Sequence, residues 1–308
     1  MNDSKPRLIV IVGPTAVGKT EVAVKIAREW GAEIVSADSM QVYRFMDIGT
    51  AKPNAEERSL VPHHIIDVVN PDEQFNAAIF IELANGIIQK LHDRKKPVFV
   101  VGGTGLYVKT LLGGLFQGPN ANEELRKLYN QELRQFGKEH LYKKLKMRDE
   151  KSASQIDKND VVRIIRALEV LDLCGESIVE KQKVHNFGCN LYDSIKIGLT
   201  LDRSSLYEKI DQRSDKMIQD GLVGEVEGLI AAGYEETLKP MQALGYKHIV
   251  RYVKGTYSIE EAVRLIKRDT RHYAKRQMTW FGADKEIVWH CPSDVDDIRK
   301  KIGQFLRQ

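Results

Sequence analysis

The chain has 308 residues, enough for one large domain or two smaller ones with a buried core. Apolar residues make up 42% of it and charged residues 29%, which excludes the disordered and fibrous classes. Lys and Arg exceed Asp and Glu by 47 to 43. This small positive balance is compatible with an anionic partner but does not require one.

The cysteines indicate a reducing compartment. Cys174, Cys189 and Cys291 are far apart, odd in number and outside any CxxC spacing, which argues against a disulfide framework or a zinc site.

The first apolar run ends at Gly13, and no stretch approaches the length of a membrane span. We therefore expect a cytoplasmic protein without membrane contact.

Strand and helix patterns alternate in the first third of the chain. An almost continuous aliphatic run at 7–12 is typical of a strand buried on both faces. Helices are expected at 20–30 and 75–92. The remaining expected strands are 32–37, 64–69, 97–101, 194–201 and, more weakly, 287–289. This alternation predicts an α/β fold with a parallel sheet and crossover helices.

The character changes between 116 and 193, where apolar strand runs disappear and charged helical segments such as 122–136 and 160–173 take over. We interpret this region as a helical insertion. The chain from 202 to 281 is again helical, and a last helical segment covers 294–308. The predicted domains are therefore a catalytic core over 1–115 and 194–308 and an insertion domain over 116–193.

A phosphate-binding loop follows the first strand and precedes the first helix. It matches G-x-x-x-x-G-K-[ST] through Gly13, Pro14, Thr15, Ala16, Val17, Gly18, Lys19 and Thr20. Its backbone N–H groups and the helix N-terminus attract phosphate, Lys19 adds a point charge, and the Thr20 hydroxyl can hold Mg²⁺. A chance match in a glycine turn is the alternative, and the flanking strand and helix oppose it. The loop alone does not separate a nucleotide from another diphosphate.

Two more loops follow expected strands. Asp38 comes after the second strand, and the carboxyl ends of parallel strands face the ligand crevice. Its carboxylate could be a general base, a metal ligand or a helix N-cap. Gly102-Gly103-Thr104-Gly105 follows the 97–101 strand and directs the Thr104 hydroxyl toward the same crevice, although the glycines could serve only a tight turn.

Taken together, eight motifs resemble the tRNA dimethylallyltransferase family, occur in its order and cover most of the chain. They are GPTAVGKT (13–20), DSMQVY (38–43), HHIID (63–67), GGTGLY (102–107), RIIRALE (163–169), GLVGEV (221–226), QALGYK (242–247) and AKRQMTWF (274–281). The resemblance implies a P-loop NTPase-like core with a helical insertion domain. Two residues depart from the family pattern: Gly282 stands where an arginine is frequent, and Asn76 replaces a common serine.

The resemblance also implies a reaction. The family moves a dimethylallyl group from dimethylallyl diphosphate to the exocyclic N6 of the adenosine 3′-adjacent to the anticodon, releasing diphosphate. Asp38 is the candidate general base, and Lys19 with Mg²⁺ held through Thr20 would stabilise the departing diphosphate. The resemblance adds Thr104 as a substrate contact. It also adds Arg213 as a second cation on the diphosphate, for which a solvated helix face is the alternative.

An RNA partner is indicated by a basic stripe, although such stripes are often only solvated surface. Arg264, Arg268, Arg271 and Lys275 fall at i, i+4, i+7 and i+11, with only Asp269 opposing them within 262–280. Asp160 is expected to cap the helix that carries Arg163 and Arg166, and salt bridges of these two with Asp160 or Glu169 are the alternative to RNA contacts. The full set expected to contact tRNA is Asp38, Ser39, Met40, Gln41, Thr104, Arg126, Arg163, Arg166, Gln242, Gly245, Tyr246, Lys247, Arg264, Arg268, Arg271, Lys275, Arg276, Gln277 and Trp280.

Rival functions share part of this pattern. An isopentenyltransferase acting on free adenine nucleotides would also need the phosphate loop and Asp38, but not the basic stripe or so large an insertion. A P-loop small-molecule kinase would turn over ATP and leaves AKRQMTWF unexplained. A non-catalytic RNA-binding protein would not need Lys19 and Thr20 aimed at a diphosphate. We expect a monomer whose partners are the anticodon stem-loop of tRNA and dimethylallyl diphosphate.

Overall fold

The computed structural model describes residues 5–115, 118–185 and 191–307. Its internal contacts divide the chain into two compact units. Unit 1 comprises Met1–Leu112 and Leu191–Gln308, and unit 2 comprises Gly113–Asn190. Both boundaries of unit 2 lie three residues before those expected for the insertion at 116 and 193. Cys189 and the expected boundary residue at 116 lie outside the described residues.

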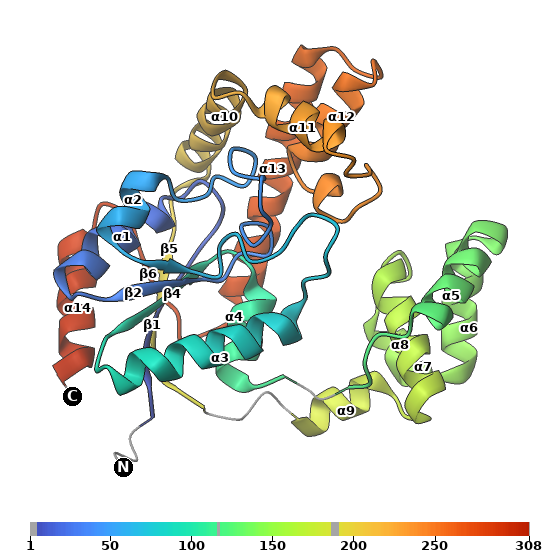
Figure 1. The fold of residues 1–308 in the computed structure, drawn as a ribbon. Coiled ribbons are helices and arrows are strands. Elements are labelled where there is room, and N and C mark those ends of the chain that lie inside the picture. Colours follow the sequence, from blue (N-terminus) through green and yellow to red (C-terminus); the bar gives the residue numbers. More distant parts are fainter. Residues whose placement is uncertain (1–4, 116–117, 186–190, 308) are drawn as a thin grey trace. The chain divides into compact units, whose positions relative to one another are not determined.

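Unit 1 contains one parallel sheet in the order β3-β2-β4-β1-β5-β6 (Figure 1). The strands are β1 (Arg7–Val12), β2 (Glu33–Ser36), β3 (His63–His64), β4 (Val98–Gly102), β5 (Asp193–Leu199) and β6 (Val288–His290). β1 lies at the centre, paired with β4 on one side and β5 on the other. The predicted α/β class with a parallel sheet is confirmed.

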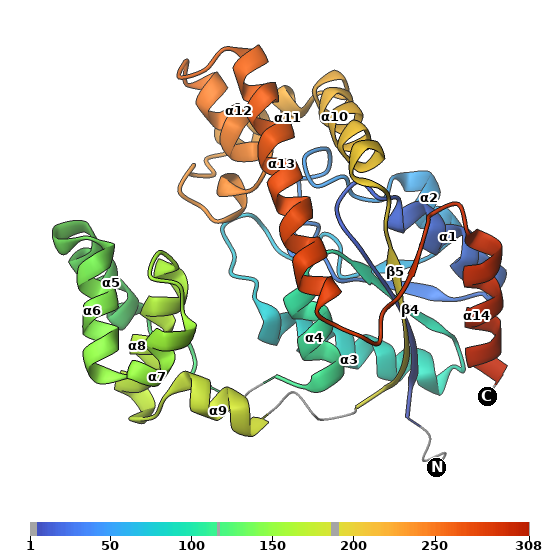
Figure 2. The same ribbon diagram turned by 180° about the vertical axis from the view of Figure 1, so that it is seen from behind.

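Helices cover both faces of this sheet. The helices of unit 1 are α1 (Lys19–Glu29), α2 (Ala55–Leu60), α3 (Ala77–Asp93), α4 (Gly105–Gly113), α10 (Arg203–Gln219), α11 (Leu222–Ala231), α12 (Tyr246–Val253), α13 (Ile259–Gly282) and α14 (Val295–Arg307), with a 3-10 turn at Pro240–Gln242. Figure 2 shows α13 running from α11 and α12 to the sheet near α4. No helix in the described part of the chain is long and apolar enough to cross a membrane.

The aliphatic run of β1 explains the two-sided cover. Successive side chains of a strand point to opposite faces, so an unbroken apolar run requires a core on each. Leu8 and Val10 pack with α3 and α4, whereas Ile9 and Ile11 pack with α1 and α14. All four side chains are fully buried. The sheet is therefore fixed from both sides, and the loops at its carboxyl edge rest on a rigid support.

Unit 2 is an all-helical body with its own core. Its helices are α5 (Glu123–Phe136), α6 (Lys138–Arg148), α7 (Glu150–Gln155), α8 (Val161–Cys174) and α9 (Ile178–His185). Tyr129, Leu141 and Ile164 are at most 2% exposed in the middle of it. The helices expected at 122–136 and 160–173 are confirmed to within one residue.

The strand expected over 64–69 is wrong in extent. β3 contains only two residues, because Ile65 and Asp67 have φ angles of 60° and 57°. A strand needs negative φ, so these left-handed residues end it. The amides of Val68 and Val69 both donate to the Val42 carbonyl instead. The chain after β3 thus folds back over the loop that follows β2.

Candidate active site

Three loops meet at the carboxyl edge of the sheet, because they follow the neighbouring strands β1, β2 and β4. The Thr104 amide donates to the Ala37 carbonyl at 3.1 Å, which joins the loops after β4 and β2. A Cβ atom on Gly102 would lie 2.1 Å from that same Ala37 oxygen. Only glycine therefore permits this approach, so Gly102 serves the contact between the loops after β4 and β2.

The phosphate loop has the conformation that anion binding requires. Gly13 and Gly18 have φ angles of 148° and 98°, a region that L side chains rarely adopt. α1 begins at Lys19 without any side-chain hydrogen bond to its N-terminal amides. The Lys19 ammonium folds back onto the loop and donates to the Gly13 and Pro14 carbonyls at 3.0 and 2.8 Å. An uncapped helix start beside a buried cation is a favourable site for phosphate.

Lys19, Arg213 and Asp38 form the charged centre of the site. Loss of hydration lowers the pKa of Lys19 to about 7, while Asp38 opposes this shift and Arg213 adds to it. Burial also lowers the pKa of Arg213, again opposed by Asp38. In the described residues Arg213 has no hydrogen bond or ion pair. Arg213 therefore faces the site rather than solvent. Lys19 and Arg213 are two poorly hydrated cations, and a bound anion would stabilise both.

Asp38 is oriented by its own turn. Its Oδ1 accepts from the Met40 amide at 2.8 Å and more weakly from the Gln41 amide at 3.3 Å. The Thr104 hydroxyl oxygen accepts from the Ser39 amide at 3.0 Å. The helix N-cap alternative for Asp38 is wrong, because no helix follows; Oδ1 instead stabilises a local turn. Oδ2 has no hydrogen bond in the described chain and stays available to a substrate.

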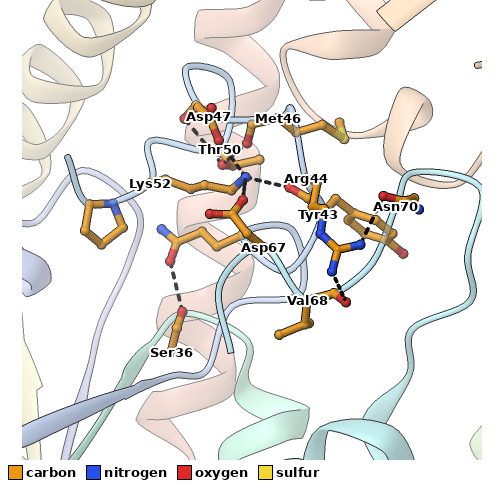
Figure 3. Close-up of polar contacts among 12 residues, drawn as sticks. Ser36, Tyr43, Arg44, Met46, Asp47, Thr50, Lys52, Asp67, Val68 and Asn70 are labelled. Atoms are coloured by element: carbon orange, nitrogen blue, oxygen red, sulfur yellow. Dashed lines mark hydrogen bonds and ion pairs between the residues drawn. The ribbon is translucent and has the colours of Figure 1, made fainter. Parts of the chain in front are cut away.

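The long loop after β2 is held by a buried cation (Figure 3). The Lys52 side chain is 2% exposed, and its ammonium donates to Asp47 at 2.7 Å, Asp67 at 2.6 Å and the Tyr43 carbonyl at 2.5 Å. Arg44 ties the same loop to the Val68 carbonyl and the Asn70 side chain. Such a fully paired lysine fixes a loop that otherwise has little regular structure.

A carboxylate from α11 clamps the other side of this loop. Glu225 accepts from the Asp47, Ile48 and Gly49 amides at 2.8, 2.8 and 3.1 Å. It also accepts from the Tyr246 hydroxyl at 2.6 Å. No role was predicted for Glu225 or Lys52. Glu225 is the single acid of the otherwise apolar GLVGEV motif, and this is the signal that could have found it.

Tyr246 and its neighbours only partly fit the tRNA assignment. Tyr246 is completely buried, and its ring would be 2.4 Å from a Cβ on Gly49, so its assignment to RNA contact is wrong. Gly245 is also buried and is the N-cap of α12, with a φ angle of 86°. Lys247 pairs with Asp269 at 3.2 Å, and exposed Gln242 donates to the Glu236 carbonyl.

The amides of Gln41 and Gln277 are used inside the protein. Gln41 accepts from the Ser36 hydroxyl and donates to the Ala51 carbonyl at 2.9 and 3.2 Å. Gln277 is 6% exposed and bonds to two backbone groups, Thr15 and Gly103. The buried Gln277 amide is not open to RNA, whereas Gln41 is only partly buried and keeps further hydrogen-bonding capacity, so its contact with tRNA stays a prediction.

The basic stripe lies on α13 but is more paired than expected. Arg264 binds Glu261 at 2.7 Å, and Arg271 binds Asp211 of α10. Arg268 binds Asp269, which is also held by Lys247 and His248. By contrast, Lys275 and Arg276 are exposed, and Trp280 is 40% exposed. The part of the stripe nearest the sheet is therefore the part open to a partner.

The arginines of unit 2 follow the salt-bridge alternative. Arg166 and Arg126 both bind Glu169, at 2.5 and 2.9 Å, and this carboxylate has no exposed surface. Arg163 pairs with Asp160, the cap of α8, at 3.4 Å but stays largely exposed. Arg126 and Arg166 hold a buried carboxylate that would be costly to leave unpaired, but their side chains are 43% and 30% exposed, so their contacts with RNA stay predictions. Arg163 remains a prediction.

The two departures from the family pattern have clear local settings. The Asn76 side chain caps α3, accepting from the Ala78 and Ile79 amides at 2.9 and 3.2 Å, as a serine would. Gly282 is the last residue of α13, and nothing lies within 4 Å of a Cβ built there. Neither residue touches the three loops of the site.

Comparison with known proteins assigns the chain to a family. The model of the IPP transferase family matches residues 41–284. The chain belongs to this family. A model described as isopentenyl transferase matches residues 6–67. Among members of the IPP transferase family, a protein of Syntrophus aciditrophicus named tRNA dimethylallyltransferase 2 is 55% identical over 98% of this chain and 97% of its own.

Solved structures agree with this assignment. The tRNA isopentenylpyrophosphate transferase of Bacillus halodurans is 39% identical, with a TM-score of 0.73 over 98% of this chain and 97% of its own. A similar enzyme from Staphylococcus epidermidis is 38% identical, with a TM-score of 0.71 over 97% and 99%. The expected P-loop NTPase-like fold with a helical insertion is thus that of the IPP transferase family.

Proposed function

We propose that this protein transfers a dimethylallyl group from dimethylallyl diphosphate to N6 of the adenosine 3′-adjacent to the anticodon of tRNA, releasing diphosphate. The observation that carries the proposal is the meeting of two unpaired, desolvated cations, Lys19 and Arg213, with the carboxylate of Asp38. The cations suit a diphosphate leaving group, and the carboxylate suits an amine nucleophile. The names of the relatives supply the donor and the acceptor class.

Asp38 acts on the nucleophile. The lone pair of the adenine amine is delocalised into the ring, so removal of an N6 proton as the bond forms assists attack. N6 bonds to C1 of the prenyl group, the C1–O bond breaks, and its electron pair goes to the bridging oxygen of diphosphate. The N6 proton passes to Asp38, whose Oδ2 is free for it while Oδ1 holds the turn.

The phosphate loop acts on the leaving group. Lys19, Arg213 and the first amides of α1 stabilise negative charge as it develops on the diphosphate. The described residues contain no group of three or more His, Cys, Asp or Glu able to hold a metal alone. A Mg²⁺ ion would therefore depend on the Thr20 hydroxyl and on phosphate oxygens of the donor, and when bound it would neutralise further charge.

The acceptor must leave the stacked anticodon loop to reach Asp38, so we infer that the adenine is extruded. Ser39, Met40 and Thr104 lie next to Asp38, and we propose that they contact the extruded adenine. Lys275, Arg276 and Trp280 on α13 and Arg163 in unit 2 are proposed to contact the rest of the RNA. We further propose that the protein acts as a monomer.

The acceptor experiment separates this function from its rivals. Purified protein with Mg²⁺ and labelled dimethylallyl diphosphate is expected to label unmodified tRNA much faster than AMP. The model that matches residues 6–67 is described only as isopentenyl transferase, so a free adenine nucleotide is the alternative acceptor. Equal or preferred labelling of AMP would establish that second candidate. ATP turnover without prenyl transfer would instead favour a kinase.

The basic face of α13 makes a separate prediction. Arg268 can be released for RNA because its partner Asp269 also pairs with Lys247 and has a hydrogen bond to His248. The double variant Arg268→Ala/Lys275→Ala is expected to weaken tRNA binding and to reduce the salt slope by about one unit for each phosphate that the protein no longer neutralises. Filter binding across a range of salt concentrations measures this slope.

A charge-matched control uses Lys300, an exposed lysine of α14 away from this face. The double variant Lys300→Ala/Arg307→Ala, with Arg307 also exposed on α14, removes the same two charges and is expected to leave the slope unchanged. Donor binding should be normal in all these variants. Unchanged affinity and slope in the double variant would mean that this face is only solvated surface.

A further inference from the structure

One buried amide joins two loops of the site. Gln277 on α13 accepts through Oε1 from the Thr15 amide of the phosphate loop at 2.8 Å. Through Nε2 it donates to the Gly103 carbonyl, after β4, at 2.9 Å. The two partners, one donor and one acceptor, fix the orientation of the amide uniquely. Gln277 is thus a direct bridge between loops that are separate in sequence.

The surrounding chain is shaped to admit this bridge. A Cβ on Gly103 would lie 2.2 Å from the Gln277 Nε2. Trp280 lies one turn further along α13 than Gln277. A Cβ on Gly105, the first residue of α4, would lie 2.1 Å from the Trp280 indole. Two glycines therefore let α13 seat two side chains against the loop after β4. The 6% exposure of Gln277 leaves no room for RNA to reach its amide.

The bridged loops carry the two halves of the proposed reaction. Thr15 belongs to the loop assigned to the diphosphate. Gly103 precedes Thr104, whose hydroxyl holds the Ser39 amide next to Asp38. A displacement of one loop relative to the other would change the distance between the leaving group and the base without removing either. Rates of oriented reactions fall by about 10²-fold for displacements near 1 Å.

We propose that Gln277 is a positioning residue that sets the phosphate loop in register with the Thr104–Asp38 loops, so that bound donor and bound acceptor meet in reactive geometry. This rests on the proposed function. In this proposal Gln277, the glutamine of AKRQMTWF, holds the two loops together and does not contact tRNA.

The test is the near-isosteric variant Gln277→Met, which fills the same space without either hydrogen bond. Donor and tRNA are each expected to bind within about twofold of the unsubstituted protein, while the single-turnover rate with both saturating falls about 10²-fold. Gln277→Glu keeps an acceptor for the Thr15 amide but loses the donor to Gly103. Its rate should lie between those of Gln277→Met and the unsubstituted protein.

A matched control removes a partly buried amide elsewhere in unit 1. The Asn85 side chain accepts from the Tyr192 hydroxyl at 2.6 Å, away from all three loops. Asn85→Leu should lower the melting temperature while the single-turnover rate at a temperature well below melting stays normal. A normal rate for Gln277→Met under those conditions, or a loss of donor affinity that accounts for the whole defect, would overturn the positioning role.

A second readout does not depend on the reaction. The Thr15 amide is expected to exchange its hydrogen faster in Gln277→Met than in Asn85→Leu, because it has lost its acceptor. If the unsubstituted protein transfers no prenyl group to tRNA, the proposed function fails, whatever the exchange shows. If it transfers the group but Thr15 exchange and rate are both unaffected by Gln277→Met, only the bridge fails.

Discussion

Asp38→Asn is expected to lower the single-turnover rate of prenyl transfer by about 10²-fold or more. The asparagine amide can still accept from the Met40 amide through its oxygen, so the turn should persist. It cannot take the proton that N6 must lose. Rapid quenching with saturating labelled donor and excess enzyme over tRNA measures the rate of the chemical step alone.

The pH of this experiment matters because Asp38 raises the pKa of Lys19. Without the carboxylate charge Lys19 would lose its proton at a still lower pH, and donor binding would suffer for a second reason. The comparison is therefore made below pH 7 with donor saturation checked for each variant. Near-normal transfer under these conditions would remove Asp38 from proton transfer.

Lys19→Ala is expected to reduce transfer by about 10²- to 10³-fold, the usual effect of deleting one donor to a developing anion. The ammonium already lies between the Gly13 and Pro14 carbonyls, so little reorganisation is needed when diphosphate binds. Thr20→Ala should also be slower and should respond to added Mg²⁺, since its hydroxyl is the proposed protein ligand. Full activity of both variants would assign the loop to another ligand.

The pKa of Lys19 gives this prediction a pH signature. Near pH 7 the donor-free protein is a mixture of ammonium and amine, and diphosphate binds the ammonium form. Donor affinity should therefore fall between pH 7.5 and 9, by up to about tenfold per unit, with proton uptake on binding. A phosphate pKa near 6 keeps the donor ionised throughout this range.

Lys19→Arg is the matched control, because a guanidinium at this position stays charged across the range. Its donor affinity should be nearly independent of pH even if weaker overall. The same lysine also affects stability with a defined sign. The unfolded chain keeps the lysine proton up to about pH 10.4, so between pH 7 and that value this group makes stability rise with pH. A pH-independent affinity in the unsubstituted protein would contradict the assignment.

The parts of the protein that the sequence predicted well are those with local signals. The run at 7–12 gave β1, because a strand buried on both faces must be apolar without alternation. Gly13 and Gly18 marked the phosphate loop, since they adopt backbone angles that favour glycine. Asp38 and Thr104 could be placed together because parallel strands end at one edge.

The wrong predictions have one physical cause. A contact with a residue far away in the sequence cannot be predicted from the local sequence pattern around a side chain. Tyr246 and Gln277 lie in motifs that resemble RNA-contacting segments, yet one is buried against Glu225 and the other bridges two loops. The strand over 64–69 reads as β, but the chain turns there so that Asp67 can meet Lys52. Such contacts link residues 15 to 262 positions apart.

By itself, then, the sequence determined the parallel sheet, the helical insertion, the phosphate loop and the candidates Asp38, Lys19 and Thr104, because periodicity, glycine positions and strand ends are encoded within short segments. Only the tertiary structure decided which polar groups are free. It paired Arg126 and Arg166 with buried Glu169 and left Arg213 near Asp38 without a direct ion pair. Burial and pairing depend on what the rest of the chain places nearby, and those neighbours are fixed only when the core is packed.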